Sequence, residues 1–95
     1  MFWYFGTFTK PKVVPTCLSF ATDSFRTRGL NVFVQPNGFF TAGGAPDSSV
    51  IVQVTCAPQG GNTWMVVTAF SDDNNLAQTT QHNVQSDIQG EVTID

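Results

Sequence analysis

The sequence predicts one α+β domain spanning residues 1–95, with a mainly antiparallel sheet of four to five strands and two helices packed on one face. Three observations lead to this prediction. The 95 residues suffice for one core and are too few for two. Extended, alternating segments fill most of the chain. Helical segments occur once near each end, which gives the order β-α-β-β-β-β-α and a layer of helices on a sheet.

Residues 2–9 are predicted to form the first strand, because both alternating sets of side chains contain bulky groups. A strand that is apolar on both sides usually lies inside a sheet or is covered at an interface. The proline-containing stretch 10–15 ends it, since proline cannot donate to a ladder. Thr16 is the predicted N-cap of a helix over residues 17–28, and Gly29 suits the left-handed position after its end.

Residues 31–35 and 39–42 are predicted to pair as a hairpin, because 36–38 reads Pro-Asn-Gly, a strong turn sequence. The glycine-rich residues 43–47 then predict a loop.

The next two strands are predicted at residues 50–55 and 63–70, with a chain reversal over 58–62. In 63–70, Trp64 lies on one face and Met65 on the other, and both faces are mainly apolar. This pattern predicts a strand in the interior of the sheet.

Ser71 or Asp72 is the predicted N-cap of the second helix, and Gly90 ends it. Its apolar stripe is narrow, which indicates a helix on the surface. The stripe consists of Leu76, Thr80, Val84 and Ile88, with Ala77 beside it. Residues 91–95 alternate and predict a short last strand.

The distribution of charge excludes some partners. All four basic residues fall within the first 28, so residues 1–28 carry a net charge of +3 and residues 29–95 a net charge of −6. A long phosphate-tracking groove needs more basic residues than this, so we expect no nucleic-acid partner. No stretch approaches the roughly 20 apolar residues of a membrane span. The compartment, cytoplasmic or exported, is not resolved.

No residue pattern predicts a cofactor or a metal site. His82 is the only histidine, and its helical position points it toward solvent. Asp72 and Asp73 lack the spacing of a calcium loop and are better explained as the start of a helix. The paired glycines match no nucleotide-binding loop and are interpreted as turns: Gly43, Gly44, Gly60 and Gly61. The alternative to a binding function is a small hydrolase or isomerase that uses Asp72, Asp73 or Asp87 in a pocket.

Cys17, at the start of a helix, and Cys56, near the end of a strand, could meet in the fold. A disulfide between them would add about 3 to 4 kcal/mol in the chain-entropy model. Two buried free thiols remain the alternative.

The runs 17–29, 50–56 and 64–70 resemble those of small bacterial proteins of unknown function, in which a helix cysteine and a strand cysteine flank a compact sheet. The resemblance implies a protein of a kind often exported or carried on mobile elements. It brings no activity and no site residues.

Aromatic residues make up 13% of the chain, which suggests that some rings lie outside the core. With both helices on one face of the sheet, the other face must be covered by a second subunit, a ligand or the glycine-rich loop. We therefore expect a non-enzymatic binding domain and a homo-oligomer, most simply a dimer, that packs sheet on sheet. The predicted ligand or interface residues are Trp3, Phe5, Phe33, Phe39, Phe40 and Trp64. A cavity among them would indicate a small apolar ligand, and a flat patch a protein partner.

Overall fold

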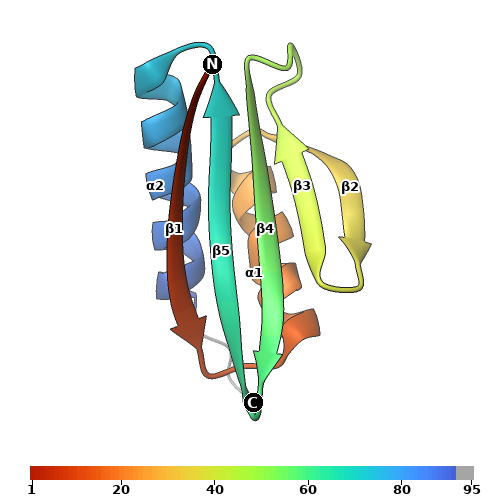
Figure 1. The fold of residues 1–95 in the computed structure, drawn as a ribbon. Helices are drawn as coiled ribbons and strands as arrows, with labels where there is room; N and C mark the ends of the chain where they lie inside the picture. The colour runs from red at the N-terminus through yellow and green to blue at the C-terminus, as the bar shows by residue number, and fades with distance from the viewer. Residues whose placement is uncertain (92–95) are drawn as a thin grey trace.

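The computed structural model describes residues 1–91. Its elements are β1 (Phe2–Lys10), α1 (Val14–Thr27), β2 (Asn31–Asn37), β3 (Phe40–Gly44), β4 (Val50–Gln59), β5 (Asn62–Ser71) and α2 (Asn74–Gly90). They form one antiparallel sheet in the strand order β1-β5-β4-β3-β2, with both helices behind it (Figure 1). The predicted fold class is confirmed. The strand predicted at 91–95 falls almost entirely outside the described residues.

The positions of two strands in the sheet bear on the predictions. β5 lies between β1 and β4, so the prediction of an interior strand at residues 63–70 is confirmed. β1 lies at an edge, although both of its faces carry bulky groups. Among residues 1–91, no strand pairs with the outer side of β1.

The first helix begins earlier than predicted. Val13 is the N-cap of α1 and Pro15 lies in its first turn, so the prediction of Thr16 as N-cap is wrong. Proline is tolerated there because the first N–H groups of a helix have no partner within the helix. At the other end, Gly29 has φ of +74°, as predicted for the residue that terminates this helix.

The β2–β3 hairpin turns later than predicted. β2 continues through Pro36, and the turn lies at Gly38, with φ of +63°, and Phe39. Proline is accommodated because β2 is the edge strand opposite β1, where a missing N–H breaks no internal pairing. The pairing is irregular, with register shifts on both sides of Val34.

Gly43 and Gly44 belong to β3, so the prediction that they form a loop is wrong. They are needed for close packing. A Cβ atom on Gly43 would lie 2.6 Å from the carbonyl oxygen of Asn31 and 2.8 Å from Cδ2 of Phe25. The missing side chain therefore lets α1 lie directly on β3.

The second helix begins at a different cap from those predicted. Asp73 is the N-cap of α2, and its carboxylate accepts a hydrogen bond from the backbone N–H of Leu76 at 3.0 Å. Ser71 is the last residue of β5 instead, and its hydroxyl donates to the carbonyl oxygen of Ser49 at 2.6 Å. Asp72 does not cap the helix either.

The core lies between the helices and the sheet face turned toward them. Alternate residues of β4 and β5 fill it together with Phe25 of α1 and Ile88 of α2. The fully buried residues of α2 include Ala77 and Val84, while the predicted stripe residue Thr80 is only half-buried. The largest fully buried side chains are Phe25, Met65, Ile88, Val52, Val54, Val67 and Val84.

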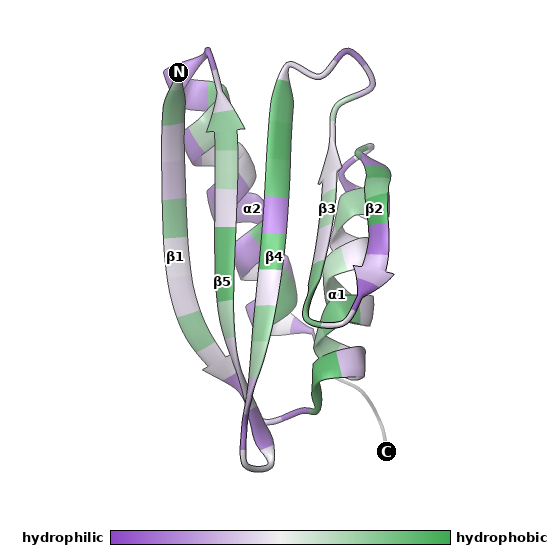
Figure 2. Cartoon of the chain, turned by 45° about the vertical axis from the view of Figure 1, so that its right-hand side comes forward, coloured by the Kyte–Doolittle hydropathy of each residue, from purple (hydrophilic) through white to green (hydrophobic). Residues whose placement is uncertain are grey.

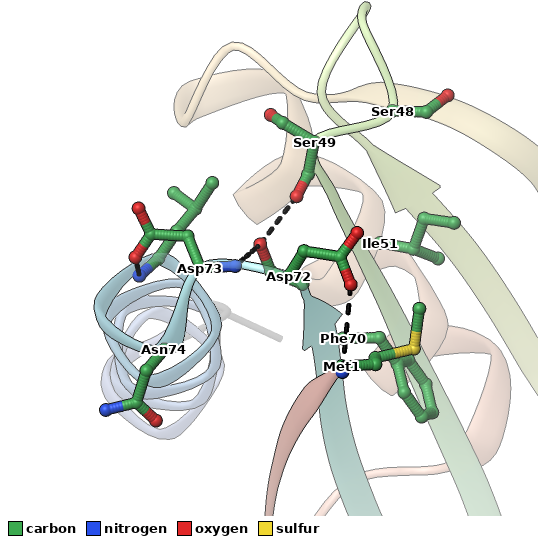
Figure 3. Close-up of a pocket in the computed structure, with 10 residues that line it drawn as sticks. Met1, Ser48, Ser49, Ile51, Phe70, Asp72, Asp73 and Asn74 are labelled. Atoms are coloured by element: carbon green, nitrogen blue, oxygen red, sulfur yellow. Dashed lines mark hydrogen bonds and ion pairs between the residues drawn. The ribbon is translucent and has the colours of Figure 1, made fainter.

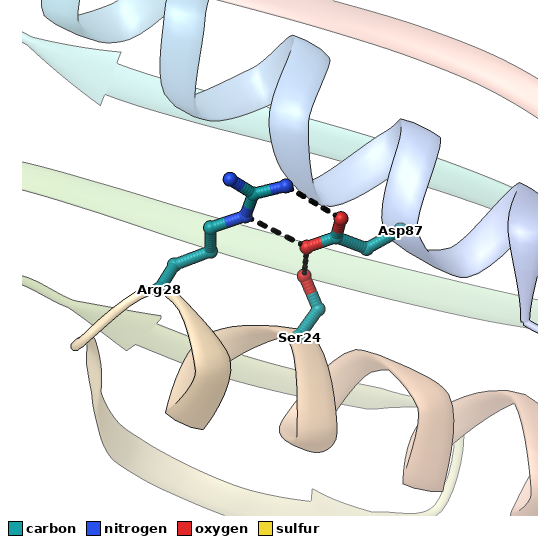
Figure 4. Close-up of polar contacts among 3 residues, drawn as sticks. All are labelled: Ser24, Arg28 and Asp87. Atoms are coloured by element: carbon teal, nitrogen blue, oxygen red, sulfur yellow. Dashed lines mark hydrogen bonds and ion pairs between the residues drawn. The ribbon is translucent and has the colours of Figure 1, made fainter.

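Two polar contacts hold the helices in place. Nζ of the buried Lys10 donates to the carbonyl oxygens of Gln89 at 2.8 Å and Glu91 at 2.7 Å, where it caps the C-terminus of α2. The carboxylate of Asp87 on α2 joins α1 by a bidentate pair with Arg28, at 2.7 and 2.9 Å (Figure 4). The hydroxyl of Ser24 donates to the same carboxylate at 2.7 Å.

Candidate functional site

The side of the sheet turned away from the helices is the candidate site. In antiparallel strands, residues that pair across the ladder share a face. The registers therefore place one set of alternate residues from each strand on this side. We call this set the open face: Trp3, Phe5, Thr7 and Thr9 of β1; Trp64, Val66, Thr68 and Phe70 of β5; Ile51, Gln53, Thr55 and Ala57 of β4; and Phe40, Ala42 and Gly44 of β3.

The open face carries no charged side chain among these residues. Its polar members are threonines and one glutamine, and the others are aromatic or aliphatic, apart from a glycine. When the chain is coloured by hydropathy, β4 and β5 are mainly green, with a purple band near the middle of β4 (Figure 2). Large apolar groups on it are exposed, with 59% of Trp3, 61% of Phe5 and 39% of Trp64 accessible. Exposed apolar side chains that gather on one face of a small domain indicate an interaction surface.

Apolar groups form a continuous row across one end of the open face. Trp3 pairs with Phe70, which pairs with Ile51. Phe33 of β2 extends the row, because a Cβ atom on Gly44 would lie 2.6 Å from Cε2 of its ring. The glycine thus allows Phe33 to lie over the sheet.

Trp3 and Phe5 also stack along β1. Their ring centroids are 5.7 Å apart with an interplanar angle of 19°. Aromatic pairs in such an arrangement are worth about 0.5–1.5 kcal/mol beyond the burial of their area. The pair is thus held together on the open face next to the edge of the sheet.

Five of the six predicted aromatic residues gather at the open face. Trp3, Phe5, Phe40 and Trp64 belong to it by register, and Phe33 lies over Gly44.

The sixth predicted residue, Phe39, does not belong to the open face. It lies in the turn, and its carbonyl oxygen accepts from the N–H of Cys56, a residue whose side chain faces the helices. Sequence reasoning missed Phe70 and Ile51 on the open face. The alternation of residues 63–70 places Phe70 with Trp64, but only the strand order places Ile51 beside Phe70.

A hollow of about 700 Å³ lies at one end of the sheet, beside the start of α2 (Figure 3). Ile51 and Phe70 of the open face border it. The rest of its lining is mainly polar and includes Ser49, Asp72 and Asp73. Trp3, Phe5 and Trp64 are not part of this hollow, so the exposed aromatic groups lie on the sheet surface outside it.

The three carboxylates of the predicted alternative enzyme each have a structural partner. Asp72 is exposed and lies 3.8 Å from the amino group of Met1. Asp73 caps α2. The hydrogen bonds from Arg28, together with that from Ser24, hold the pKa of Asp87 below its usual value. A lowered pKa suits an ion pair between helices rather than a general acid.

Nothing in residues 1–91 assembles a metal site, since no group of three or more His, Cys, Asp or Glu residues is found there. His82 is exposed on α2, as predicted from its helical position.

The two cysteines are buried free thiols on the helix side of the sheet. Burial raises the pKa of Cys17, whose Sγ lies 3.8 Å from the carbonyl oxygen of Lys12. Burial, together with the neighbouring Cys17, raises the pKa of Cys56 to about 12. Both thiols are therefore protonated at neutral pH and poor nucleophiles.

Comparisons with known proteins identify no family. No family model matches the chain, and no curated protein does. Among solved structures, the chain is similar to the solution structure of the 18 kDa protein CC1736 from Caulobacter crescentus. The TM-score is 0.47 with 11% sequence identity, and the match covers 94% of this chain and 89% of that one. Neither α1 nor α2 is long and apolar enough to cross a membrane.

Proposed function

We propose that this protein is a non-enzymatic interaction domain that packs the open face of its sheet against the open face of a second copy. The observation that carries the proposal is the combination of exposed Trp3, Phe5 and Trp64 with the absence of charge from the whole open face. Tryptophan and other aromatic residues are enriched at the centres of interfaces, where charged residues are depleted.

The size of the open face is consistent with a second copy of the chain as its partner. Strand length and spacing give it a projected area of roughly 600 Å², and the protruding aromatic groups raise its accessible area above that value. A stable interface takes about 800 Å² from each partner. Two like sheets also match in shape, because aligned sheets pack about 10 Å apart and interdigitate their side chains.

The distribution of charge favours a second copy as well. The chain carries a net charge of −3, yet within residues 1–91 no charged side chain belongs to the open face. Two copies can therefore meet without placing like charges in contact, and repulsion between the more distant charges is screened over about 8–10 Å at ordinary salt. A small apolar ligand would need an enclosed site, whereas Trp3 and Trp64 stand exposed on the sheet.

The test places one charge at the centre of the open face. Thr68 lies between Phe5 and Gln53 in adjacent strands. Sedimentation equilibrium over a range of concentrations should show wild-type association that Thr68→Lys weakens at least tenfold. Ser19→Lys adds the same charge to the exposed side of α1 and should leave association unchanged. Association that is equal in Thr68→Lys and wild type would contradict the proposal, as would a wild-type protein that binds an apolar small molecule there as a monomer.

A further inference from the structure

The two edges of the sheet are built differently. β2, at one edge, contains Pro36 and pairs irregularly with β3. β1, at the other edge, pairs with β5 without interruption from Phe2 to Lys10. Bulges, proline and charge are the features by which proteins prevent an edge strand from pairing with another chain. β1 has no proline or bulge, and its only charged residue is Lys10, at its end.

The hydrogen bonds of the sheet show which backbone groups of β1 face outward. The carbonyl oxygen of Val50 and the N–H of Cys56, both on β4, bond toward β3 at 3.1 and 2.7 Å. Alternate residues of an antiparallel strand direct their N–H and C=O groups to opposite sides. The odd-numbered residues of β4 therefore bond to the even-numbered residues of β5, with which they pair in an uninterrupted register. The odd-numbered residues of β5 then bond toward β1, where they pair with even-numbered residues, so the even-numbered residues of β1 bond to β5. The residues that direct both backbone groups to the free edge are Trp3, Phe5, Thr7 and Thr9.

We propose that β1 pairs antiparallel with β1 of a second copy, about a twofold axis at Gly6. This register overlaps the full strand, with Phe2 of one copy opposite Lys10 of the other. Every outward-facing residue then meets an outward-facing residue, Trp3 opposite Thr9 and Phe5 opposite Thr7. Each such pair exchanges two hydrogen bonds, so the new ladder contains about eight.

Residues near the axis fit a second copy. Gly6 is the central residue of β1, and the side-chain amides of Gln81 and Gln85 occupy the space where a Cβ atom would lie. Residues opposite each other in a non-hydrogen-bonded pair approach to about 4.5 Å between Cα atoms, which a glycine permits. The copies of Lys10 lie at opposite ends of the ladder, about 26 Å apart, so like charges do not meet.

The helix behind the edge also leaves room for a second copy. α2 packs on both β1 and β5 rather than outside β1. Strand spacing therefore puts the two α2 helices about 10 Å apart across the axis, near the usual 8–10 Å between packed helices. A hollow of about 370 Å³ lies between β1 and α2, lined by Tyr4, Phe5, Gln78, Thr79, Gln81 and His82. This lining contains no Asp, Glu, Lys or Arg residue.

This pairing goes beyond the proposed function and does not depend on it. It places both helix layers on one side and joins two open faces into one larger surface, in which Trp3 and Phe5 of both copies lie near the centre. Edge pairing alone gives a dimer, and edge pairing together with face packing gives a tetramer. Because the edge formed by β2 is irregular, edge pairing does not extend further.

Hydrogen exchange of the wild-type protein tests the pairing directly. Raising the concentration should slow exchange of the outward amides of Phe5, Thr7 and Thr9 at least tenfold. The amides of Tyr4 and Phe8 bond within the chain and should be protected at all concentrations. Outward amides that exchange equally fast at all concentrations would overturn the proposal, and this measurement needs no variant.

A pair of variants separates the edge from the open face. Thr7→Pro removes an outward donor and no bond to β5, whereas Thr7→Val keeps the donor and the size of the side chain. We expect Thr7→Pro to lose edge association by sedimentation and Thr7→Val to retain it, and equal association of the two would overturn the proposal. Thr68→Lys should leave protection of the outward amides intact. Failure of the face proposal and failure of the edge proposal thus give different results.

Discussion

Replacing Gly43 with alanine tests whether the close approach of α1 to β3 holds the fold in place. The added Cβ atom would lie 2.6 Å from the carbonyl oxygen of Asn31 and 2.8 Å from Cδ2 of Phe25. Phe25 is fully buried, and the carbonyl oxygen belongs to the backbone of β2. Relief therefore requires a shift of α1 or of the β2–β3 hairpin. Overpacking of this kind costs about 1–3 kcal/mol, and a backbone contact puts the expected loss at about 2–3 kcal/mol.

Urea unfolding and thermal unfolding, both followed by circular dichroism at one protein concentration, measure this loss. Because 1 kcal/mol shifts the Tm of a domain of 60–100 residues by about 4–8 °C, the Tm should fall by about 10–20 °C. Gly61→Ala is the matched control, since a Cβ atom at Gly61 meets nothing within 4 Å, and it should change stability by less than about 0.5 kcal/mol. A loss at Gly43 no larger than that of the control would refute the packing argument.

Two predictions concern pH. The hydrogen bonds from Arg28 lower the pKa of Asp87 in the folded protein. The stabilisation of the folded state by these bonds is therefore complete above the pKa of the unfolded state, about 3.9. It is lost as the pH falls through the lower pKa of the folded state. Urea unfolding between pH 2 and 6 should show this loss, and Asp87→Asn should flatten it; an identical acid profile in the variant would contradict the assignment. The pKa of Cys56 is raised to about 12 and that of Cys17 is also raised, so the unfolded thiols ionise from about pH 8.5 while the folded ones stay protonated. Stability should therefore fall as the pH rises above about 8.5, by at most about 1.4 kcal/mol per pH unit for each thiol, and Cys56→Ala should reduce the slope in alkaline unfolding curves. An unchanged slope in that variant would show that Cys56 does not titrate in this way.

The order of elements could be predicted because the signals are local. Alternation in residues 63–70 is enough to place Trp64 and Met65 on opposite faces, and the structure agrees. Gly29 ends α1 because a left-handed residue is needed there, whatever surrounds the helix.

The failed predictions at the glycine pair and at the hairpin arose where tertiary contacts set the requirement. Gly43 and Gly44 carry a turn-like composition, yet they lie in a strand because α1 and the ring of Phe33 occupy the space above them. Pro36 is compatible with β2 only because that strand lies at an edge. Neither the packing over the two glycines nor the edge position of β2 can be predicted from nearby residues.

The candidate site also has a part that local sequence predicts and a part that only the tertiary structure decides. Residue types and alternation were sufficient to name most of the aromatic groups of the open face, because the face of a strand on which a side chain lies depends only on its position along that strand. Which strands are neighbours depends on contacts between residues far apart in the chain. The pairing of β1 with β5 brought Trp3 to Phe70 and placed an uninterrupted strand at the edge, whereas the register of the β2–β3 hairpin left Phe39 in a turn. Composition and periodicity do not determine the order of the strands in the sheet, because that order follows from how the whole core packs.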